Sequence, residues 1–296
     1  MKKIVALGYM VIIAGIICPV MAAGNGEKKP SSQPAAGTHA KQSETPPGAA
    51  QVPVFKPEAS PAEGQGPGMV ALAKASAANK YLFIFFSKAD DENTMALRKV
   101  FDEAMVKSAK KADPAAVKID DPAEKEIVAK YGVSRAPMPL VLAVAPNGAV
   151  TKGLPATFDE KTLLDAFASP GMEKSLKALQ DRKLVLLCVQ NKSTKDAAAA
   201  MKGVHEFAAD KKLATDTGIV TVVVQIDPAD AAEAKFLTQL KIDPKTEQAV
   251  TAFIAPPGVV LSIIKGATTK EAFMTVLKAA LSGGCGPGGC GPGGCS

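Results

Sequence analysis

Val117-Lys118-Ile119-Asp120-Asp121-Pro122 returns later in the chain as Val224-Gln225-Ile226-Asp227-Pro228, and this repeat decides the fold. A second pair of segments follows in the same order, Ala145-Pro146-Asn147-Gly148-Ala149-Val150 and then Ala255-Pro256-Pro257-Gly258-Val259-Val260. The separation within each copy is similar, 28 residues from the Asp120 position to the Gly148 position and 31 in the second copy. A period of about 100 residues is that of a domain rather than of a solenoid repeat. The sequence therefore predicts two copies of one compact domain.

The composition allows two such domains and argues against nucleic acid as a partner. The chain has 296 residues, no Trp and 5% aromatic residues, so its cores must be built mainly from aliphatic side chains. The formal net charge is +6, but only Arg98, Arg135 and Arg182 among the 35 basic residues are arginines. Nucleic-acid readers favour Arg and cluster their charge. The Lys residues here are scattered among 29 acidic residues, which is typical of a solvated surface.

The N-terminus has the pattern of a secretory signal peptide, predicted to span residues 1–23. Lys2 and Lys3 precede an apolar run at 4–17, and small residues follow at Ala22 and Ala23. We expect an exported protein, periplasmic, in the cell envelope or extracellular. No later segment has the ~20 apolar residues of a membrane span, so no transmembrane segment should remain after cleavage. Cys18 raises the alternative of lipidation, which the bulky residue before it disfavours.

Three further regions follow from composition. Residues 24–67 contain eight Pro and few large apolar side chains, and they are predicted to form a disordered linker. The two domains are placed at 68–170 and 171–282. A Cys-Gly-Pro-Gly-Gly tail at 283–296 ends the chain.

Hydrophobic patterning predicts the same order of elements in both copies: helix, strand, helix, strand, helix, hairpin, helix. In the first copy these are expected at 69–79, 81–86, 93–110, 115–119, 122–130, 140–145 with 149–152, and 160–167. In the second copy they are expected at 172–179, 184–190, around 201–207, 219–226, 229–240, 250–254 with 259–264, and 269–281. The fold class is α/β, with a mixed central sheet and helices on both of its faces.

This order resembles the thioredoxin fold. The segment 85–95 lines up with the strand end and active-site turn of that family. Gly132-Val133, then Met138-Pro139-Leu140, then Pro146-Asn147-Gly148 resemble its second landmark, a cis-proline that opens a strand before a hairpin. The resemblance covers 69–168 directly and 172–281 through the internal repeat. It implies two tandem thioredoxin-like domains with a cis-proline at Pro139.

The sequence departs from the family where the reactive thiols should be. Catalytic members carry two Cys at a helix N-terminus, which lowers the pKa of the first thiol. Here the matching segment is Asp90-Asp91-Glu92-Asn93, with Asp90 and Asn93 in the degenerate active-site positions. The second copy has Ser193-Thr194-Lys195-Asp196, with Ser193 and Asp196 in those positions. Neither turn can form a mixed disulfide, so dithiol exchange by the domains is excluded.

The carboxylates and the proline at these places each leave two interpretations open. Acidic residues in a first helical turn are good capping groups, which is favoured over a catalytic or metal-binding role for Asp90, Asp91 and Glu92. Pro139 is either part of the architecture or the mark of a retained peptide-docking edge. The second copy has no Pro near Ala249, so any such edge belongs to the first domain.

The remaining Cys and His residues of the two predicted domains and the linker do not indicate chemistry. Cys188 lies within the apolar run 184–189 and is predicted to be a small buried hydrophobe. His205 flanks an apolar helical stripe without a neighbouring ligand cluster, and His39 lies in the linker.

The tail carries Cys285, Cys290 and Cys295 in a five-residue repeat, where packing cannot explain them. Four interpretations remain open: a soft-metal site for Cu(I) or Zn, mobile redox thiols, intermolecular disulfides, or an incidental low-complexity end. The resemblance implies that a thioredoxin-like protein without thiols serves as a protein- or peptide-binding module. We therefore favour a non-enzymatic envelope protein with a thiol-capturing or metal-capturing tail. The alternatives are a thiol-disulfide oxidoreductase that uses the tail, and a structural component cross-linked through it.

Overall fold

The computed structural model describes residues 65–282. The predicted signal peptide with Cys18, nearly all of the predicted linker with His39, and the tail with its three cysteines lie outside this range. Within it the chain forms two four-stranded mixed sheets, one in each copy of the repeat. No helix of residues 65–282 combines the length and the hydropathy that crossing a bilayer requires.

The first domain is built around a sheet of order β2-β1-β3-β4. Strands β1 and β2 are parallel, while β3 runs antiparallel to β1 and β4 antiparallel to β3. Its elements are α1 (Pro67–Ala77), β1 (Tyr81–Ser87), α2 (Glu92–Ser108), β2 (Ala112–Lys118), the 3-10 turn η1 (Pro122–Glu124), α3 (Lys125–Tyr131), η2 (Val133–Arg135), β3 (Leu140–Val144), β4 (Val150–Pro155) and α4 (Glu160–Leu164).

The second domain repeats this plan with the sheet order β6-β5-β7-β8. The parallel pair is β5 and β6, and the antiparallel pairs are β5 with β7 and β7 with β8. Its elements are α5 (Pro170–Gln180), β5 (Leu184–Val189), α6 (Ala197–Ala208), α7 (Lys211–Thr217), β6 (Thr221–Ile226), η3 (Ala231–Glu233), α8 (Ala234–Gln239), β7 (Val250–Ala255), β8 (Val259–Lys265) and α9 (Lys270–Leu281).

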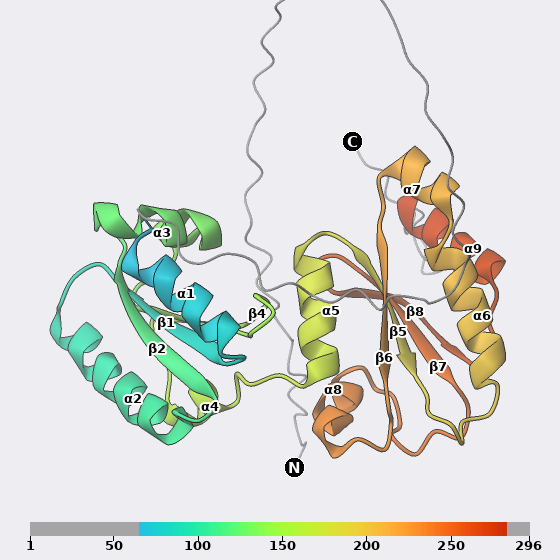
Figure 1. Ribbon diagram of the computed structural model, residues 1–296, viewed down its shortest axis with the longest axis horizontal. Helices are drawn as coiled ribbons and strands as arrows, with labels where there is room; N and C mark the ends of the chain where they lie inside the picture. The colour runs from blue at the N-terminus through green and yellow to red at the C-terminus, as the bar shows by residue number, and fades with distance from the viewer. Residues whose placement is uncertain (1–64, 283–296) are drawn as a thin grey trace, which may run out of the picture. The chain divides into compact units, whose positions relative to one another are not determined.

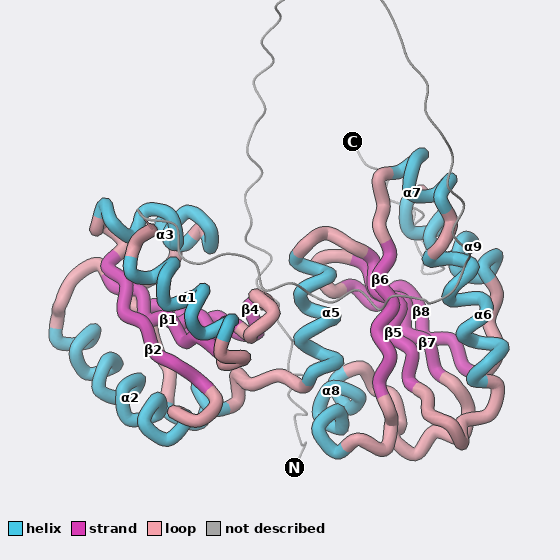
Figure 2. The backbone as a smooth tube through the Cα atoms, in the orientation of Figure 1, coloured by secondary structure: helices cyan, strands magenta, loops and turns pink. Residues whose placement is uncertain are grey.

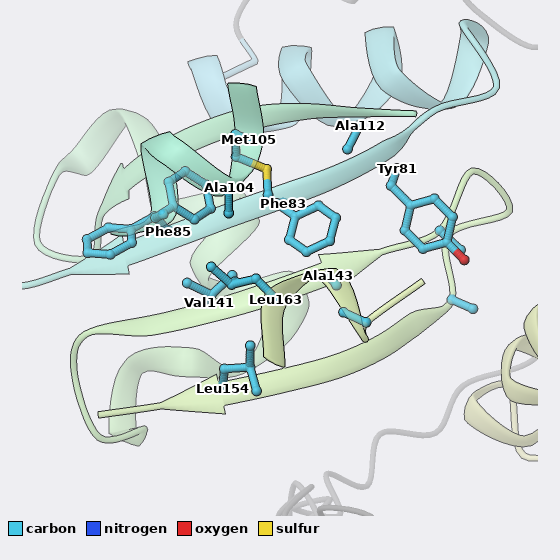
Figure 3. Packing of buried hydrophobic residues seen from close by; sticks show 14 residues of the cluster. Tyr81, Phe83, Phe85, Ala104, Met105, Ala112, Val141, Ala143, Leu154 and Leu163 are labelled. Atoms are coloured by element: carbon cyan, nitrogen blue, oxygen red, sulfur yellow. The ribbon is translucent and has the colours of Figure 1, made fainter. Parts of the chain in front are cut away.

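Helices cover both faces of each sheet, which is why the central strands are mostly apolar. Both β1 and β5 are buried at every position. In the second domain α5 and α8 lie on one side of the sheet and α6, α7 and α9 on the other (Figure 1). The strands form a continuous layer between these helices (Figure 2). Figure 3 shows one of the two clusters of the first domain, where Phe83, Phe85 and Met105 pack between the sheet and its helices.

Strand order and element order together give each domain the thioredoxin-like fold that the sequence predicts. The strand registers also equate positions of the two copies. Leu140 of β3 pairs with Phe86, and Val250 of β7 pairs with Val189. Pro139 of the first domain therefore corresponds to Ala249 of the second, and Met138 corresponds to Gln248.

The structure corrects the predicted elements in four places. Strand β2 was predicted at 115–119 but begins at Ala112 and includes Pro114, which is tolerated because β2 is an edge strand. The single helices predicted at 122–130 and 229–240 are each a 3-10 turn followed by a short helix, η1 with α3 and η3 with α8. Helix α7 was not predicted; the Asp210 carboxylate caps its N-terminus, and Gly218 ends it at a φ of 68°.

A buried carboxylate anchors the first helix of each domain. Glu124 accepts a hydrogen bond from the Gly68 N–H at 2.9 Å, and Glu233 accepts one from the Gly171 N–H at 2.7 Å. Glu233 also accepts a hydrogen bond from the Ser169 hydroxyl at 2.5 Å. Both glutamates come from the short segment after the second strand, and both are about 95% buried or more. The repeat therefore includes a polar device that fixes α1 and α5 against their sheets.

Candidate functional site

The turn that follows β1 in the first domain is held by ordinary structural contacts. Asp91 is the N-cap of α2, and its carboxylate accepts the Thr94 N–H at 2.8 Å. This hydrogen bond holds the pKa of the Asp91 carboxyl below its usual value. Asp90 pairs instead with Lys118 of β2 at 2.5 Å. Capping and an exposed ion pair account for both carboxylates.

A hollow of about 560 Å³ opens beside this turn, between α2 and the C-terminal end of β2. Its lining residues are Phe85, Ser87, Asp90, Thr94, Met95, Arg98, Ala116, Val117 and Lys118. Met95 is unusual among the apolar side chains because it is 60% exposed. The Arg98 guanidinium lies 5.5 Å from the centre of the buried Phe85 ring. The hollow thus combines an apolar wall with a fixed cation and a charged rim.

The segment before β3 lies at the same end of the sheet. The peptide bond between Met138 and Pro139 is cis. Among the described residues, neither the N–H nor the C=O of Met138 makes a hydrogen bond, whereas the Pro139 carbonyl accepts the Ala156 N–H at 2.8 Å. Leu140 then enters the ladder opposite Phe86. Met138 therefore presents a backbone donor and acceptor that have no partner in residues 65–282.

The corresponding edge of the second domain is closed by the chain itself. The Lys195 N–H donates to the Glu247 carbonyl at 2.8 Å, and the Lys195 carbonyl accepts the Ala249 N–H at 2.9 Å. These bonds form an isolated parallel bridge between Lys195 and Gln248. An exposed ion pair between the Lys195 ammonium and the Glu247 carboxylate reinforces it at 2.9 Å. The degenerate turn of this domain thus bonds to the groups on either side of Gln248, and the Gln248 carbonyl itself accepts the Thr246 hydroxyl at 2.8 Å.

The rest of that second turn is a local polar network. The Asn191 side-chain oxygen accepts hydrogen bonds from the hydroxyls of Ser193 and Thr194. The Asn191 amide nitrogen donates to the Asp227 carboxylate at 2.9 Å. Asp196 has a left-handed backbone, with a φ of 63°, and its side chain does not cap α6. A smaller hollow of about 270 Å³ lies here and is lined mainly by polar side chains.

No thiol of the described range lies at either turn. Cys188 is buried in β5, and burial raises the pKa of its thiol to about 12, so it stays protonated and unreactive. His205 is exposed on α6. Residues 65–282 contain no cluster of three or more His, Cys, Asp or Glu that could hold a metal ion. Cys285, Cys290 and Cys295 lie outside these residues.

The closure by Lys195 is the feature that the sequence did not reveal. The absence of Pro at Ala249 does show that the second edge differs from the first. Nothing in the pattern around Lys195 marks it as a strand partner, because a single bridge has no periodicity. The exposed Met95 was likewise read only as part of a helical run.

Comparison with known proteins returns solved structures alone, since no protein-family model and no curated protein sequence matches the chain. Thioredoxin O2 from Arabidopsis thaliana in its oxidised state is 19% identical, with a TM-score of 0.28, over 33% of this chain and 81% of its own. The first two thioredoxin domains of Saccharomyces cerevisiae Eps1p are 13% identical, with a TM-score of 0.27, over 75% of this chain and 99% of theirs. The same domains of Naumovozyma dairenensis Eps1p are 10% identical, with a TM-score of 0.27, over 71% of this chain and 93% of theirs. We base the fold assignment on strand and element order rather than on these scores.

Proposed function

We propose that this is an exported, redox-inactive protein whose first thioredoxin-like domain binds extended segments of other proteins. The observation that carries the proposal is the backbone N–H and C=O of Met138, just before β3, which make no hydrogen bond within residues 65–282. An extended peptide can pair with such a donor and acceptor as an additional strand. The second domain offers less to the same ligand, because the Gln248 carbonyl, equivalent to that of Met138, already accepts the Thr246 hydroxyl and Lys195 bonds to the residues on either side.

The hollow beside the degenerate turn supplies the selectivity that backbone pairing lacks. Its exposed Met95 offers a flexible, polarizable contact for an apolar side chain. Arg98, held over the Phe85 ring, and Lys118 place positive charge beside it, balanced in part by Asp90. Each of these two cations is paired with a carboxylate, Arg98 with Asp102 and Lys118 with Asp90, so we propose that the preferred segment is selected by an apolar residue.

Binding is tested with a permanently unfolded protein, reduced and carboxymethylated lactalbumin, titrated against residues 24–296. Met95→Glu should weaken binding roughly tenfold or more, since it places a charge in the apolar wall (about 1.4 kcal/mol). Val106→Glu is the matched control: Val106 lies on the same helix, is 78% exposed and is not part of the hollow. Equal affinities for the two variants would remove the hollow from the proposal.

The docking edge is tested separately by amide exchange in the same complex. The Met138 amide, which has no partner among the described residues, should exchange more slowly when the unfolded protein binds. The Ala249 amide should be unaffected because it is already bonded to Lys195. Protection at Ala249 without protection at Met138 would contradict the assignment.

A second candidate function concerns the tail, and it is favoured by the distribution of thiols. Apart from the buried Cys188, a chain cleaved after residue 23 keeps only Cys285, Cys290 and Cys295. We propose that these thiols capture a soft metal, Cu(I) or Zn, or a partner thiol, while the folded domains carry out no exchange. The alternative assigns disulfide transfer to the tail, or a structural role in which intermolecular disulfides link the protein to the envelope.

Three measurements separate these roles of the tail. Native mass spectrometry of the exported protein reports bound metal and oxidation state together. Insulin reduction that is lost on truncation after Leu281 would establish the oxidoreductase alternative in place of the binding role. Oligomers that disappear on reduction would instead support cross-linking.

A further inference from the structure

Helix α5 packs against both domains, which lie in one compact unit of the chain. Its Ala178 and Leu179 belong to a core cluster of the second domain. Glu173, Leu176 and Gln180 lie on a different stripe of the helix, since they follow one another at intervals of three and four residues. Leu176 packs against a core cluster of the first domain. The helix therefore joins the two domains through this second stripe.

The two polar residues of the stripe bond to strands of the first sheet. The side-chain oxygen of Gln180 accepts the Val150 N–H at 2.9 Å, and its side-chain nitrogen donates to the Val150 carbonyl at 2.7 Å. Gln180 therefore takes the place of a neighbouring strand at the first residue of β4. At the other end of the stripe, the hydroxyl of Tyr81, the first residue of β1, donates to the Glu173 carboxyl at 2.5 Å.

The Tyr81 hydroxyl has two acceptors beside it but only one proton to donate. These acceptors are the Glu173 carboxyl and, at 3.3 Å, the Ala168 carbonyl, while the Ala168 N–H donates to the hydroxyl oxygen at 2.9 Å. With Glu173 ionised, the phenol proton goes to the carboxylate, and the Ala168 carbonyl does not receive it. With Glu173 protonated, the carboxyl donates to the Tyr81 oxygen and the phenol proton is free for Ala168. The neutral carboxyl therefore completes the network between the domains.

The surroundings of Glu173 also favour its neutral form. Burial raises the pKa of the Glu173 carboxyl above its ordinary value of 4.5, and the negative charge of Glu233 on η3 acts in the same direction. The hydrogen bond from Tyr81 and the positive charge of Lys174 act against this shift without cancelling it. A raised pKa favours the closed junction below the ordinary value, and this contribution is lost as the pH rises through the raised value.

The other charged side chains at the junction do not reproduce this behaviour. Lys111 and Lys177 carry ammonium groups, which titrate far above the carboxyl range. Asp165 and Lys235 form an exposed ion pair between the domains at 3.4 Å. That pair would act in the opposite direction, because protonation of Asp165 in acid would break it.

We propose that this junction is a proton-operated latch, which is closed most firmly when Glu173 is neutral and loosens when Glu173 ionises. Loosening withdraws the Gln180 amide from β4 and leaves the Val150 N–H and C=O to water. The latch is independent of the proposed function, since none of its residues lines the hollow beside the degenerate turn.

Amide exchange at Val150 tests the latch, since this N–H is bonded across the junction. It is followed by NMR on residues 24–296 with the three tail cysteines changed to Ser, as a protection factor relative to an unstructured chain at the same pH. From moderately acidic to neutral pH the protection of Val150 should fall at least about threefold, because each unit of pKa shift is worth tenfold and Glu173 is only partly buried. The Ala145 amide, bonded to Ala149 within the same hairpin, should keep constant protection.

Three variants assign the effect. Glu173→Gln cannot ionise and should keep Val150 protected throughout this pH range. Glu206→Gln, on an exposed glutamate of α6, is the matched control and should retain the wild-type pH dependence. Gln180→Ala should lower the protection of Val150 at every pH, because it removes the acceptor. Far-UV circular dichroism checks that each variant is folded.

Tyrosine fluorescence locates the titration independently. Residues 24–296 contain two tyrosines, so Tyr131→Phe leaves Tyr81 as the reporter. An ionised carboxylate quenches a tyrosine that donates to it, so emission should fall as the pH rises and Glu173→Gln should abolish this step. Constant protection of Val150 in the wild type would overturn the latch, as would a pH dependence that Glu173→Gln retains. Protection that rises with pH, the direction expected from Asp165 and Lys235, would also overturn it.

Discussion

The buried glutamates that anchor α1 and α5 give the sharpest prediction for stability. Glu233→Ala removes the acceptor for the Gly171 N–H and the Ser169 hydroxyl, and both donors are left at a helix N-terminus in the interior. Glu124→Ala removes the acceptor of a single donor, the Gly68 N–H. The structure therefore predicts that the two substitutions differ in cost although their positions in the repeat are equivalent.

The expected loss of stability follows from the number of hydrogen bonds that each glutamate accepts. A hydrogen bond to a charged group contributes about 1.5–3 kcal/mol, and the carboxylate gains up to about 1 kcal/mol from the helix dipole. Burying the carboxylate offsets part of this, so the lower end of each range applies. We expect losses of about 2 kcal/mol for Glu124→Ala and about 3 kcal/mol for Glu233→Ala. Glu233→Gln keeps a neutral acceptor in place and should lose about half as much as the Ala variant.

The assay is urea unfolding of residues 24–296, monitored by far-UV circular dichroism. Amide exchange read by mass spectrometry assigns each loss to its domain. Glu103→Ala and Glu206→Ala are the controls, one exposed glutamate in each domain, with expected effects within about 0.5 kcal/mol. A Glu233→Ala variant as stable as the controls would refute the anchoring role. A larger loss for Glu124→Ala than for Glu233→Ala would refute the bond count.

Three further predictions test other parts of the structure. Cys188 should resist Ellman's reagent in the folded protein and react once urea unfolds it, because burial raises its thiol pKa to about 12. The hydrogen bond from Lys270 lowers the pKa of Asp210, so Asp210 stabilises the fold above its unfolded pKa and this contribution is lost as the pH falls through the folded value. Asp210→Asn should therefore flatten the loss of the urea midpoint between neutral and strongly acidic pH. Gly203→Ala should destabilise the second domain by about 2 kcal/mol despite its better helix propensity, as measured by urea unfolding, because the added Cβ would lie 2.2 Å from the Thr268 carbonyl oxygen.

The core of each domain could be predicted from the sequence because its signals are local and periodic. The apolar runs 81–86 and 184–190 gave the central strands to within one residue at either end. The hairpin turns around Gly148 and Gly258 were fixed by Pro, Asn and Gly. The extent of edge strand β2 was harder to predict, because Asp113-Pro114 has the composition of a turn. Pro is tolerated there only because the strand lies at the edge of the sheet, which depends on the tertiary structure. Helix α7 lies in a polar stretch where propensity alone is weak.

The candidate site could be predicted only in part. The absence of Cys from the two turns and the position of Pro139 can be predicted from the sequence, because both depend only on residue identity. The closure by Lys195 depends on a contact across 52 residues, from Lys195 to Glu247, and leaves no pattern in either segment. The anchoring glutamates show an intermediate case. The strand registers equate Val117 with Ile226, two residues away from the match of Val117 with Val224 in the sequence. With that shift, Asp121-Pro122-Ala123-Glu124 matches Asp230-Ala231-Ala232-Glu233, but burial of their carboxylates cannot be inferred from the sequence.

Comparing the two copies separates what the fold requires from what each domain exposes. The buried anchor recurs in both domains, as do the strand order and a bulge early in the fourth strand, at Thr151 of β4 and Leu261 of β8. The exposed backbone groups do not recur. Within residues 65–282 the Met138 carbonyl has no partner, whereas the Gln248 carbonyl accepts the Thr246 hydroxyl, and Gln180 bonds to β4 while no described side chain bonds to the backbone of β8. Each sheet has two edge strands, β2 and β4 in the first domain and β6 and β8 in the second, whereas Met138 lies before the central strand β3. The peptide site proposed at Met138 therefore lies at the start of a central strand and not on an outer edge of the sheet.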